Sequence, residues 1–335
     1  MTLNVGVIGT GMIGQDHIRR ITQVLSGAEV VAVNDANAEV AHQVASGLKN
    51  ATVHLSGEEL IADPSVDAVI VCSWGPTHEQ YVLAAIAARK PVFCEKPLAS
   101  TAEACRNIID AEVAHGSRLV QVGFMRRYDA AYRALKDIID AGTIGAPLIY
   151  YSGHRNPEVP GYYTKDAAIS DTAVHDFDVT RWLLGEELRS IRVISGKANS
   201  LGGGLQDPLL LILETDRGVL VNVETSVNIR YGYDIRGEVV GETGTAALAD
   251  RGPVVVRSAN HVGVGVPVDW RERFIAAYDT EFQEWIGAVA AGLGAAGPSS
   301  WDGYAAQMVC EAGLQALASG DRVEISLIDK PALYA

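Results

Sequence analysis

The chain has 335 residues, of which 48% are apolar, and a formal net charge of −14. This length indicates two domains or one large domain. The acidic balance argues against nucleic acid and anionic membrane surfaces as partners, because both attract clustered lysine and arginine.

The first part of the chain alternates short apolar segments with amphipathic ones. Strands are expected at residues 5–8, 30–34, 53–55, 68–72, 91–94 and 119–122, and helices at 14–25, 38–47, 58–61, 77–88 and 101–115. Because parallel strands must be joined by crossovers that usually contain a helix, this alternation predicts a parallel sheet with helices on both faces.

The pattern changes after residue 123. A helix is expected at 130–141, and two more at 280–291 and 301–318. Between them, strands are expected at 148–152, 191–195, 209–214, 219–227, 235–240, 246–249 and 254–257, with turns at 215–218, 241–244 and 250–253. Strands separated by short turns predict a mostly antiparallel sheet. We therefore expect one domain over residues 1–123 and a second over 124–335.

A glycine-rich turn joins the first strand to the first helix, with the sequence Gly9-Thr10-Gly11-Met12-Ile13-Gly14. In a dinucleotide-binding turn, Gly9 would permit the tight turn, Gly11 the approach of a pyrophosphate, and Gly14 close helix packing. Met12 and Ile13, at the helix N-terminus, would then also contact the cofactor. The alternative is a glycine-rich turn without a ligand.

Asp35 ends the second strand, about 20 residues after the last glycine of the motif. An acidic residue there accepts hydrogen bonds from the adenosine ribose and repels a 2′-phosphate. No arginine follows in residues 36–38, so NAD is favoured over NADP. The alternative is that Asp35 caps the next helix.

The segment 73–78 follows the fourth strand, where open parallel sheets bind ligands. Ser73, Trp74 and Pro76 are expected to line the nicotinamide side of the cofactor. His78 either contacts the cofactor or is a structural residue at a helix start.

Glu95-Lys96-Pro97 follows the fifth strand. Pro97 favours an extended conformation at Lys96, which would direct this lysine toward the crevice. Its ammonium could donate to a substrate hydroxyl and stabilise the oxygen as it becomes a carbonyl. Glu95 would lie beside the cofactor. The alternative is a solvated lysine.

Asp171 and His175 are four residues apart at an expected helix start, which places them on one face. Histidine suits proton transfer near neutral pH, and a neighbouring carboxylate, Asp171 or Asp178, could bind substrate or tune the imidazole. Spacing alone favours an ordinary surface pair, but the glycine motif and Lys96 favour a catalytic role.

Two further segments offer polar side chains: residues 123–129 with Arg126, and 154–157 with His154 and Asn156. Both could bind hydroxyl groups or serve as loop and cap residues. No H-x-x-x-H motif and no clustered Cys/His spacing occurs, so no metal site is expected. Four dispersed cysteines, no leader-like start and no membrane-length apolar run predict a soluble cytoplasmic protein.

The order of these motifs resembles the glucose–fructose oxidoreductase/inositol dehydrogenase/rhizopine catabolism family over the whole chain, and most closely its bacterial inositol 2-dehydrogenases. The resemblance implies an α/β protein. It would have an N-terminal Rossmann dinucleotide-binding domain and a C-terminal α+β domain with a large, mostly antiparallel open sheet. The outer face of that sheet would form a homotetramer.

By position, the resemblance implies that Lys96, Asp171 and His175 are catalytic. His175 would be the general base, Asp171 would hold substrate and assist His175, and Lys96 would bridge cofactor and substrate. Arg126, His154 and Asn156 would bind other hydroxyls, and Tyr233 would close the pocket. The implied reaction is NAD-dependent oxidation of a ring hydroxyl, most specifically of myo-inositol to 2-keto-myo-inositol. The alternatives are scyllo-inositol or an aldose as substrate, or a non-catalytic NAD-binding sensor or scaffold.

Overall fold

The computed structural model describes residues 2–249 and 254–335, so the turn expected at 250–253 lies outside the described residues. Two compact units are present, and neither is continuous in sequence. Unit 1 contains the chain up to Phe124 together with Tyr278–Gln307 and Ile328–Ala335. Unit 2 contains Met125–Ala277 and Met308–Leu327. The sequence pattern suggested a single division after residue 123, because nothing in it marks where the two last helices change unit.

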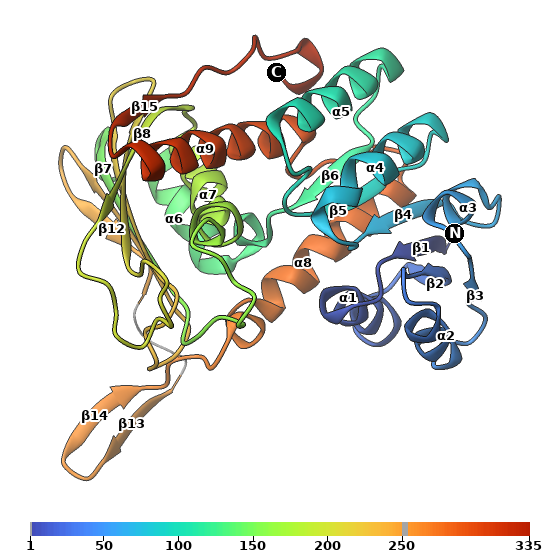
Figure 1. Cartoon of the computed structure of the whole chain (residues 1–335), viewed down its shortest axis with the longest axis horizontal. Coiled ribbons are helices and arrows are strands. Elements are labelled where there is room, and N and C mark those ends of the chain that lie inside the picture. Colours follow the sequence, from blue (N-terminus) through green and yellow to red (C-terminus); the bar gives the residue numbers. More distant parts are fainter. Residues whose placement is uncertain (1, 250–253) are drawn as a thin grey trace. The chain divides into compact units, whose positions relative to one another are not determined.

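Unit 1 is built on a six-stranded sheet that is parallel, as predicted, with the strand order β3-β2-β1-β4-β5-β6 (Figure 1). Its strands are β1 Leu3–Ile8, β2 Ala28–Asn34, β3 Thr52–Val53, β4 Ala68–Val71, β5 Val92–Glu95 and β6 Val120–Gly123. The strand order reverses between β1 and β4. Crevices at such a reversal, at the carboxyl ends of the strands, are the usual ligand sites of open parallel sheets.

The helices of this unit in the first part of the chain are α1 Met12–Gln23, α2 Ala38–Ser46, α3 Gly57–Ala62, α4 His78–Ala87 and α5 Ala102–His115. A later helix, α8 Trp270–Ala290, also contributes to the core. Its Phe282 and Trp285 are buried among β-strand side chains, and the Phe282 and Phe93 rings are 4.2 Å apart between centroids. Helix α8 therefore completes a core whose other members come from the first hundred residues.

Unit 2 contains a seven-stranded sheet in the order β12-β11-β7-β10-β9-β8-β15. These strands are β7 Pro147–Arg155, β8 Leu188–Ser195, β9 Leu209–Thr215, β10 Leu220–Ser226, β11 Asp234–Gly241, β12 Thr245–Ala247 and β15 Arg322–Glu324. The sheet is mostly antiparallel, as predicted, with one parallel pair formed by β7 and β10. A separate hairpin consists of β13 Val255–Ser258 and β14 His261–Val264.

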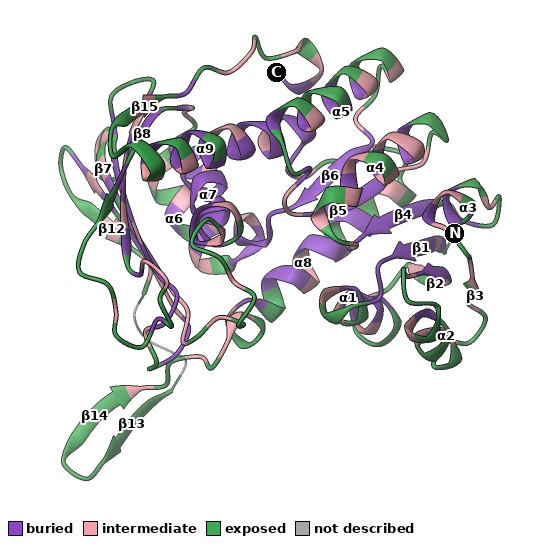
Figure 2. Ribbon diagram, viewed as in Figure 1, coloured by how far each residue is buried: buried purple, intermediate pink, exposed green. Residues whose placement is uncertain are grey.

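One face of the seven-stranded sheet is covered by helices. Along β9, every second residue is buried, as the period of a half-covered strand requires. The covering helices are α6 Ala130–Asp140, α7 Val174–Leu184 and the unit 2 part of α9 Ser300–Ser319 (Figures 1 and 2). Gly313 lets helix α9 pack closely against Ile169. A Cβ at this position would lie only 2.9 Å from the Ile169 side chain.

Among the described residues, no helix combines the length and apolar character needed to cross a lipid bilayer.

The approach of α1 to β1 depends on Gly14. A Cβ at this position would lie 2.0 Å from the carbonyl oxygen of Gly9, which is backbone and cannot rotate away. We predict that Gly14→Ala lowers the free energy of unfolding by about 1–3 kcal/mol, as overpacking does. Urea unfolding followed by circular dichroism would measure it. Gly11→Ala is the matched control, since nothing lies within 4 Å of its Cβ. Equal stability of the two variants would contradict the packing argument.

Candidate active site

The glycine motif forms a tight turn between β1 and α1. Gly9 has φ +91°, and a Cβ there would lie 2.5 Å from the backbone of Cys72 and Ser73 at the end of β4. By contrast, a Cβ on Gly11 would meet nothing within 4 Å. The loop is therefore fixed on the sheet side and open at Gly11.

The N-terminus of α1 is suited to an anion. No side chain caps the helix at Gly11, so the first backbone N–H groups lack a cap acceptor there. Met12, the first helical residue, is 63% exposed, whereas Ile13 packs against the core. Helix N-termini with uncapped N–H groups bind phosphates, so this geometry fits the pyrophosphate of a dinucleotide.

Asp35 connects the end of β2 to the glycine loop. Its Oδ2 accepts hydrogen bonds from Thr10 N at 2.7 Å and Thr10 Oγ1 at 3.1 Å, and its Oδ1 accepts from Asn37 N at 2.9 Å. The side chain that caps α2 is that of Asn37, which accepts from Glu39 N. Asp35 is therefore not the helix cap. A carboxylate has about four lone-pair sites, so Oδ1, which accepts one hydrogen bond here, can accept another from a ribose hydroxyl.

The loop after β4 exposes Trp74, which is 78% accessible, and carries Pro76 in a short 3₁₀ turn. Ser73 Oγ lies 2.7 Å from Thr77 Oγ1. His78 is buried, with Nδ1 2.7 Å from the Pro97 carbonyl and Nε2 3.0 Å from the Ser73 carbonyl. These contacts favour the structural interpretation of His78, which joins the loops that follow β4 and β5.

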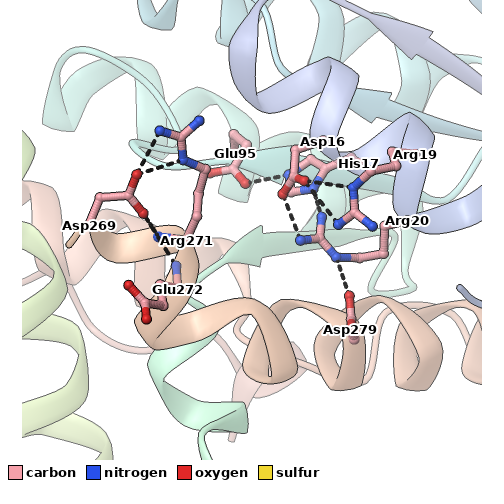
Figure 3. A network of polar contacts seen from close by, with 9 residues as sticks. All are labelled: Asp16, His17, Arg19, Arg20, Glu95, Asp269, Arg271, Glu272 and Asp279. Carbon is pink, nitrogen blue, oxygen red and sulfur yellow. Dashed lines mark hydrogen bonds and ion pairs between the residues drawn. The ribbon is translucent and has the colours of Figure 1, made fainter. Parts of the chain in front are cut away.

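Glu95 and Lys96 lie at the carboxyl end of β5, where the sequence placed them. Glu95 is buried, and its Oε1 is 2.8 Å from His17 Nε2 (Figure 3). Its Oε2 accepts from the Lys96 backbone N–H at 3.2 Å. Lys96 is half-buried, and the Lys96–Pro97 peptide bond is cis.

The segment that carries Asp171 and His175 is not a simple helix start. Residues Ala168–Ala173 form a π-helical turn that leads into α7. Asp171 lies in this wider turn and is exposed, whereas His175, in the first turn of α7, is buried. Such π-helical turns are frequent at functional sites. Lys96 belongs to unit 1, and Asp171 and His175 to unit 2.

Asp178, the other carboxylate considered as a partner of His175, forms an ion pair with Arg127. It is buried, and its carboxylate accepts hydrogen bonds from Arg127 Nε at 2.9 Å and Arg127 Nη2 at 2.5 Å. A buried carboxylate requires such a partner. That Asp178 also tunes the His175 imidazole stays a prediction.

Three of the four candidate substrate residues form one buried cluster around Asp176. Arg126 Nη1 donates to Asp176 Oδ1 at 2.6 Å, and His154 Nδ1 lies 2.8 Å from Asp176 Oδ2. Tyr233 Oη lies 3.2 Å from His154 Nε2. The rings of His154 and His175 are 6.5 Å apart between centroids. The structure thus gathers Arg126, His154 and Tyr233 beside the candidate base.

Asp176 is ionised within this cluster. Burial alone would raise its pKa, but the Arg126 guanidinium and His154 hold the pKa well below its usual range. Ser152 Oγ adds a third hydrogen bond, at 2.7 Å. Asp176 was not among the residues predicted from the sequence, because the burial of Arg126, which requires a carboxylate partner, is visible only in the folded chain.

Asn156, the fourth candidate, directly follows β7, the strand that carries His154. It lines a pocket of about 630 Å³ in unit 2 together with Tyr233. Arg126 and His154 do not line this pocket. Among the described residues, no group of three or more His, Cys, Asp or Glu side chains is arranged to hold a metal ion.

The chain matches known proteins over its full length. The model of the oxidoreductase family with an NAD-binding Rossmann fold matches residues 3–124, and that of the GFO/IDH/MocA C-terminal domain matches residues 132–247. An inositol 2-dehydrogenase of Pseudomonas savastanoi pv. phaseolicola is 53% identical and covers 100% of both chains. Inositol 2-dehydrogenase 3 of Saccharopolyspora erythraea is also 53% identical, over 100% of this chain and 98% of that one.

Solved structures of related proteins also resemble this chain. The crystal structure of myo-inositol dehydrogenase from Lactobacillus casei in complex with NAD(H) and myo-inositol has a TM-score of 0.98, with 42% identity and 100% coverage of both chains. That of scyllo-inositol dehydrogenase from the same species has a TM-score of 0.88 at 22% identity, over 97% of this chain and 99% of that one, which shows a shared fold. With its glycine loop, its two large sheets and these matches, the chain belongs to the GFO/IDH/MocA family of NAD-binding oxidoreductases.

Proposed function

We propose that this protein is an NAD-dependent dehydrogenase that oxidises a ring hydroxyl of a cyclic polyol, specifically myo-inositol to 2-keto-myo-inositol. The observation that carries the proposal is the full-length similarity to the Lactobacillus casei protein whose structure holds NAD(H) and myo-inositol. The uncapped start of α1, the open side of Gly11 and the carboxylate of Asp35 fit the same cofactor.

In this proposal, unit 1 residues hold the cofactor, chiefly those predicted in 1–123, and the region from 124 onward binds the substrate. Bound NAD supplies a hydride acceptor, nicotinamide C4. His175 takes the proton of the substrate hydroxyl as general base, and Asp171 holds substrate and assists it. The Lys96 ammonium donates a hydrogen bond to the substrate oxygen while the C–O bond becomes a carbonyl. This hydrogen bond stabilises the charge that develops on the oxygen.

The cluster around Asp176 supports a polyol as substrate. A cyclic polyol presents hydroxyl groups around its ring, and each must find a partner when it leaves water. Arg126, His154 and Tyr233 offer a donor fork, an imidazole and a phenol, all held by buried contacts before substrate arrives. Asn156, at the pocket beside Tyr233, adds an amide.

We further propose a cytoplasmic homotetramer assembled through the second sheet. The face of that sheet opposite the helices exposes Tyr151, Ile194 and Leu220, which are 43%, 43% and 50% accessible. It also carries a depression of about 370 Å³. Contact with a second copy of the chain would remove these apolar side chains from water.

The first experiment is a substrate panel. NADH formation is followed with NAD or NADP and with myo-inositol, scyllo-inositol, chiro-inositol, glucose or xylose. Turnover with NAD that is fastest on myo-inositol would support the full proposal. Faster turnover on another member would keep the reaction and change the substrate. No turnover, with NAD binding shown by calorimetry, would favour the sensor or scaffold alternative.

Replacement of the general base should strongly lower kcat and leave cofactor binding unchanged. For His175→Ala we expect kcat to fall about 10²–10⁴-fold, because proton transfer loses its acceptor. Stopped-flow or steady-state NADH formation would measure kcat, and NADH fluorescence would measure binding. The control is His261→Ala, an exposed histidine of the same unit. Unchanged kcat in His175→Ala would eliminate this residue as the base.

Asp35 should determine the cofactor preference. A unit negative charge, such as one on the 2′-phosphate of NADP, is repelled by roughly 4 kcal/mol when it lies about 4 Å from a carboxylate at an effective dielectric near 20. We therefore expect Asp35→Ser to raise kcat/KM for NADP at least about tenfold. A tenfold gain corresponds to about 1.4 kcal/mol of transition-state stabilisation. Glu29→Gln, at the opposite end of the same strand, is the control. If NADP remains as poor a cofactor as before, another residue controls the choice.

A further inference from the structure

A buried chain of hydrogen bonds connects helix α1 to the residue that precedes Lys96. His17, on α1, is fully buried, with Nε2 2.8 Å from Glu95 Oε1. Its other ring nitrogen, Nδ1, lies 2.6 Å from Arg20 Nη1 (Figure 3). All of these residues belong to unit 1. The imidazole therefore stands between a guanidinium and a carboxylate, with one ring nitrogen toward each.

These two partners fix the tautomer of His17. A guanidinium has donors only, so Nδ1 must accept from Arg20, and the ring proton must sit on Nε2. Nε2–H then donates to the Glu95 carboxylate. Burial lowers the pKa of His17, although the Glu95 carboxylate acts in the opposite direction. The lowered pKa favours the neutral ring. A neutral ring keeps one donor and one acceptor in these directions.

Arg20 is itself held firmly. Its Nε donates to Asp279 Oδ1 at 2.7 Å, and its Nη2 donates to Asp16 Oδ2 at 2.7 Å. The guanidinium carbon lies 5.1 Å from the centroid of the Tyr278 ring. Since Asp279 and Tyr278 are on α8, two helices fix the arginine and thereby the acceptor side of His17.

At the other end of this chain of hydrogen bonds, the Glu95 carboxylate contacts the backbone of Lys96. Glu95 Oε2 accepts from the Lys96 backbone N–H at 3.2 Å. The carboxylate also lies over Gly123, where a Cβ would come within 3.2 Å of it. With Oε1 held by His17 and Oε2 on the lysine backbone, the carboxylate has one orientation, and the backbone at Lys96 is defined with it.

We propose that His17 is a positioning residue of the dehydrogenase reaction: by donating to Glu95, it orients the carboxylate that holds the backbone of Lys96 and so aims the lysine side chain. This inference deepens the proposed function and rests on it. His17 touches no substrate or cofactor in this role and acts only through Glu95.

A histidine that merely fills the core would behave differently. The His17 ring does pack against Phe282, with centroids 4.3 Å apart, and against Phe93 at 6.0 Å. Packing alone predicts loss of stability on substitution, whereas positioning predicts a loss of kcat that a side chain with the same donor can restore.

The test compares His17→Leu with His17→Gln. Leucine removes the donor to Glu95, and we expect kcat to fall about tenfold to a hundredfold, the scale of a reacting group displaced by up to an ångström. The amide nitrogen of glutamine can stand in for Nε2, so His17→Gln should keep kcat within about threefold of the wild type, far less than a misplacement costs. NADH affinity, measured by fluorescence in both variants, separates a loss of kcat from a loss of cofactor binding.

Phe282→Leu is the packing control, since it removes the ring stacked on His17 and leaves the hydrogen bonds in place. It should lower the melting temperature while kcat is retained. Unchanged kcat in His17→Leu would overturn the inference, as would glutamine and leucine variants that are equally impaired.

Crystal structures of the two His17 variants separate this inference from the proposed function. Displacement of the Glu95 carboxylate and the Lys96 backbone in the leucine variant alone would support the positioning role. An unmoved Glu95 and Lys96 would overturn it. If the wild-type protein oxidises no polyol, the proposed function fails, while these structures still test the link from His17 to Lys96.

Discussion

Each unit of this protein contains a buried guanidinium whose hydrogen-bond network reaches candidate site residues. Arg20 in unit 1 and Arg126 in unit 2 are 0% and 1% exposed. A cation in such a place requires carboxylates and further acceptors, and removal of one partner of a buried pair typically costs about 3–5 kcal/mol. Arg20 is surrounded by Asp16, Asp279 and His17, and Arg126 by Asp176 and His154.

The two clusters share a consequence for the candidate site. In each, a histidine lies within hydrogen-bond distance of both the arginine and a carboxylate, so its ring is oriented by buried charges rather than by solvent. A ring fixed in this way loses little conformational entropy when a ligand binds, which is the physical content of preorganisation. The demand for charge compensation in the core and the demand for a defined site are met by the same side chains.

The features that the sequence predicted depend on local chemistry. The glycine loop, the strand that ends in Asp35 and the Glu95-Lys96 pair follow from backbone conformation and strand ends, which neighbouring residues determine. The pairing of Arg127 with Asp178 spans 51 positions, and that of Arg20 with Asp279 spans 259. No periodicity within a strand or helix encodes these partners, so the engagement of Asp178 and the role of α8 in unit 1 required the folded structure.

Asp35 shows how a specificity residue can be tied to the structure around it. Its Oδ2 accepts the Thr10 N–H and hydroxyl, and its Oδ1 accepts from Asn37 N. A neutral side chain at this position would remove a charge that repels a 2′-phosphate, but it would also weaken the acceptor that orders the glycine loop. Cofactor choice and loop order are therefore coupled through one carboxylate. A variant that is adapted to NADP would need both a cation for the added phosphate and a new acceptor for the backbone of Thr10.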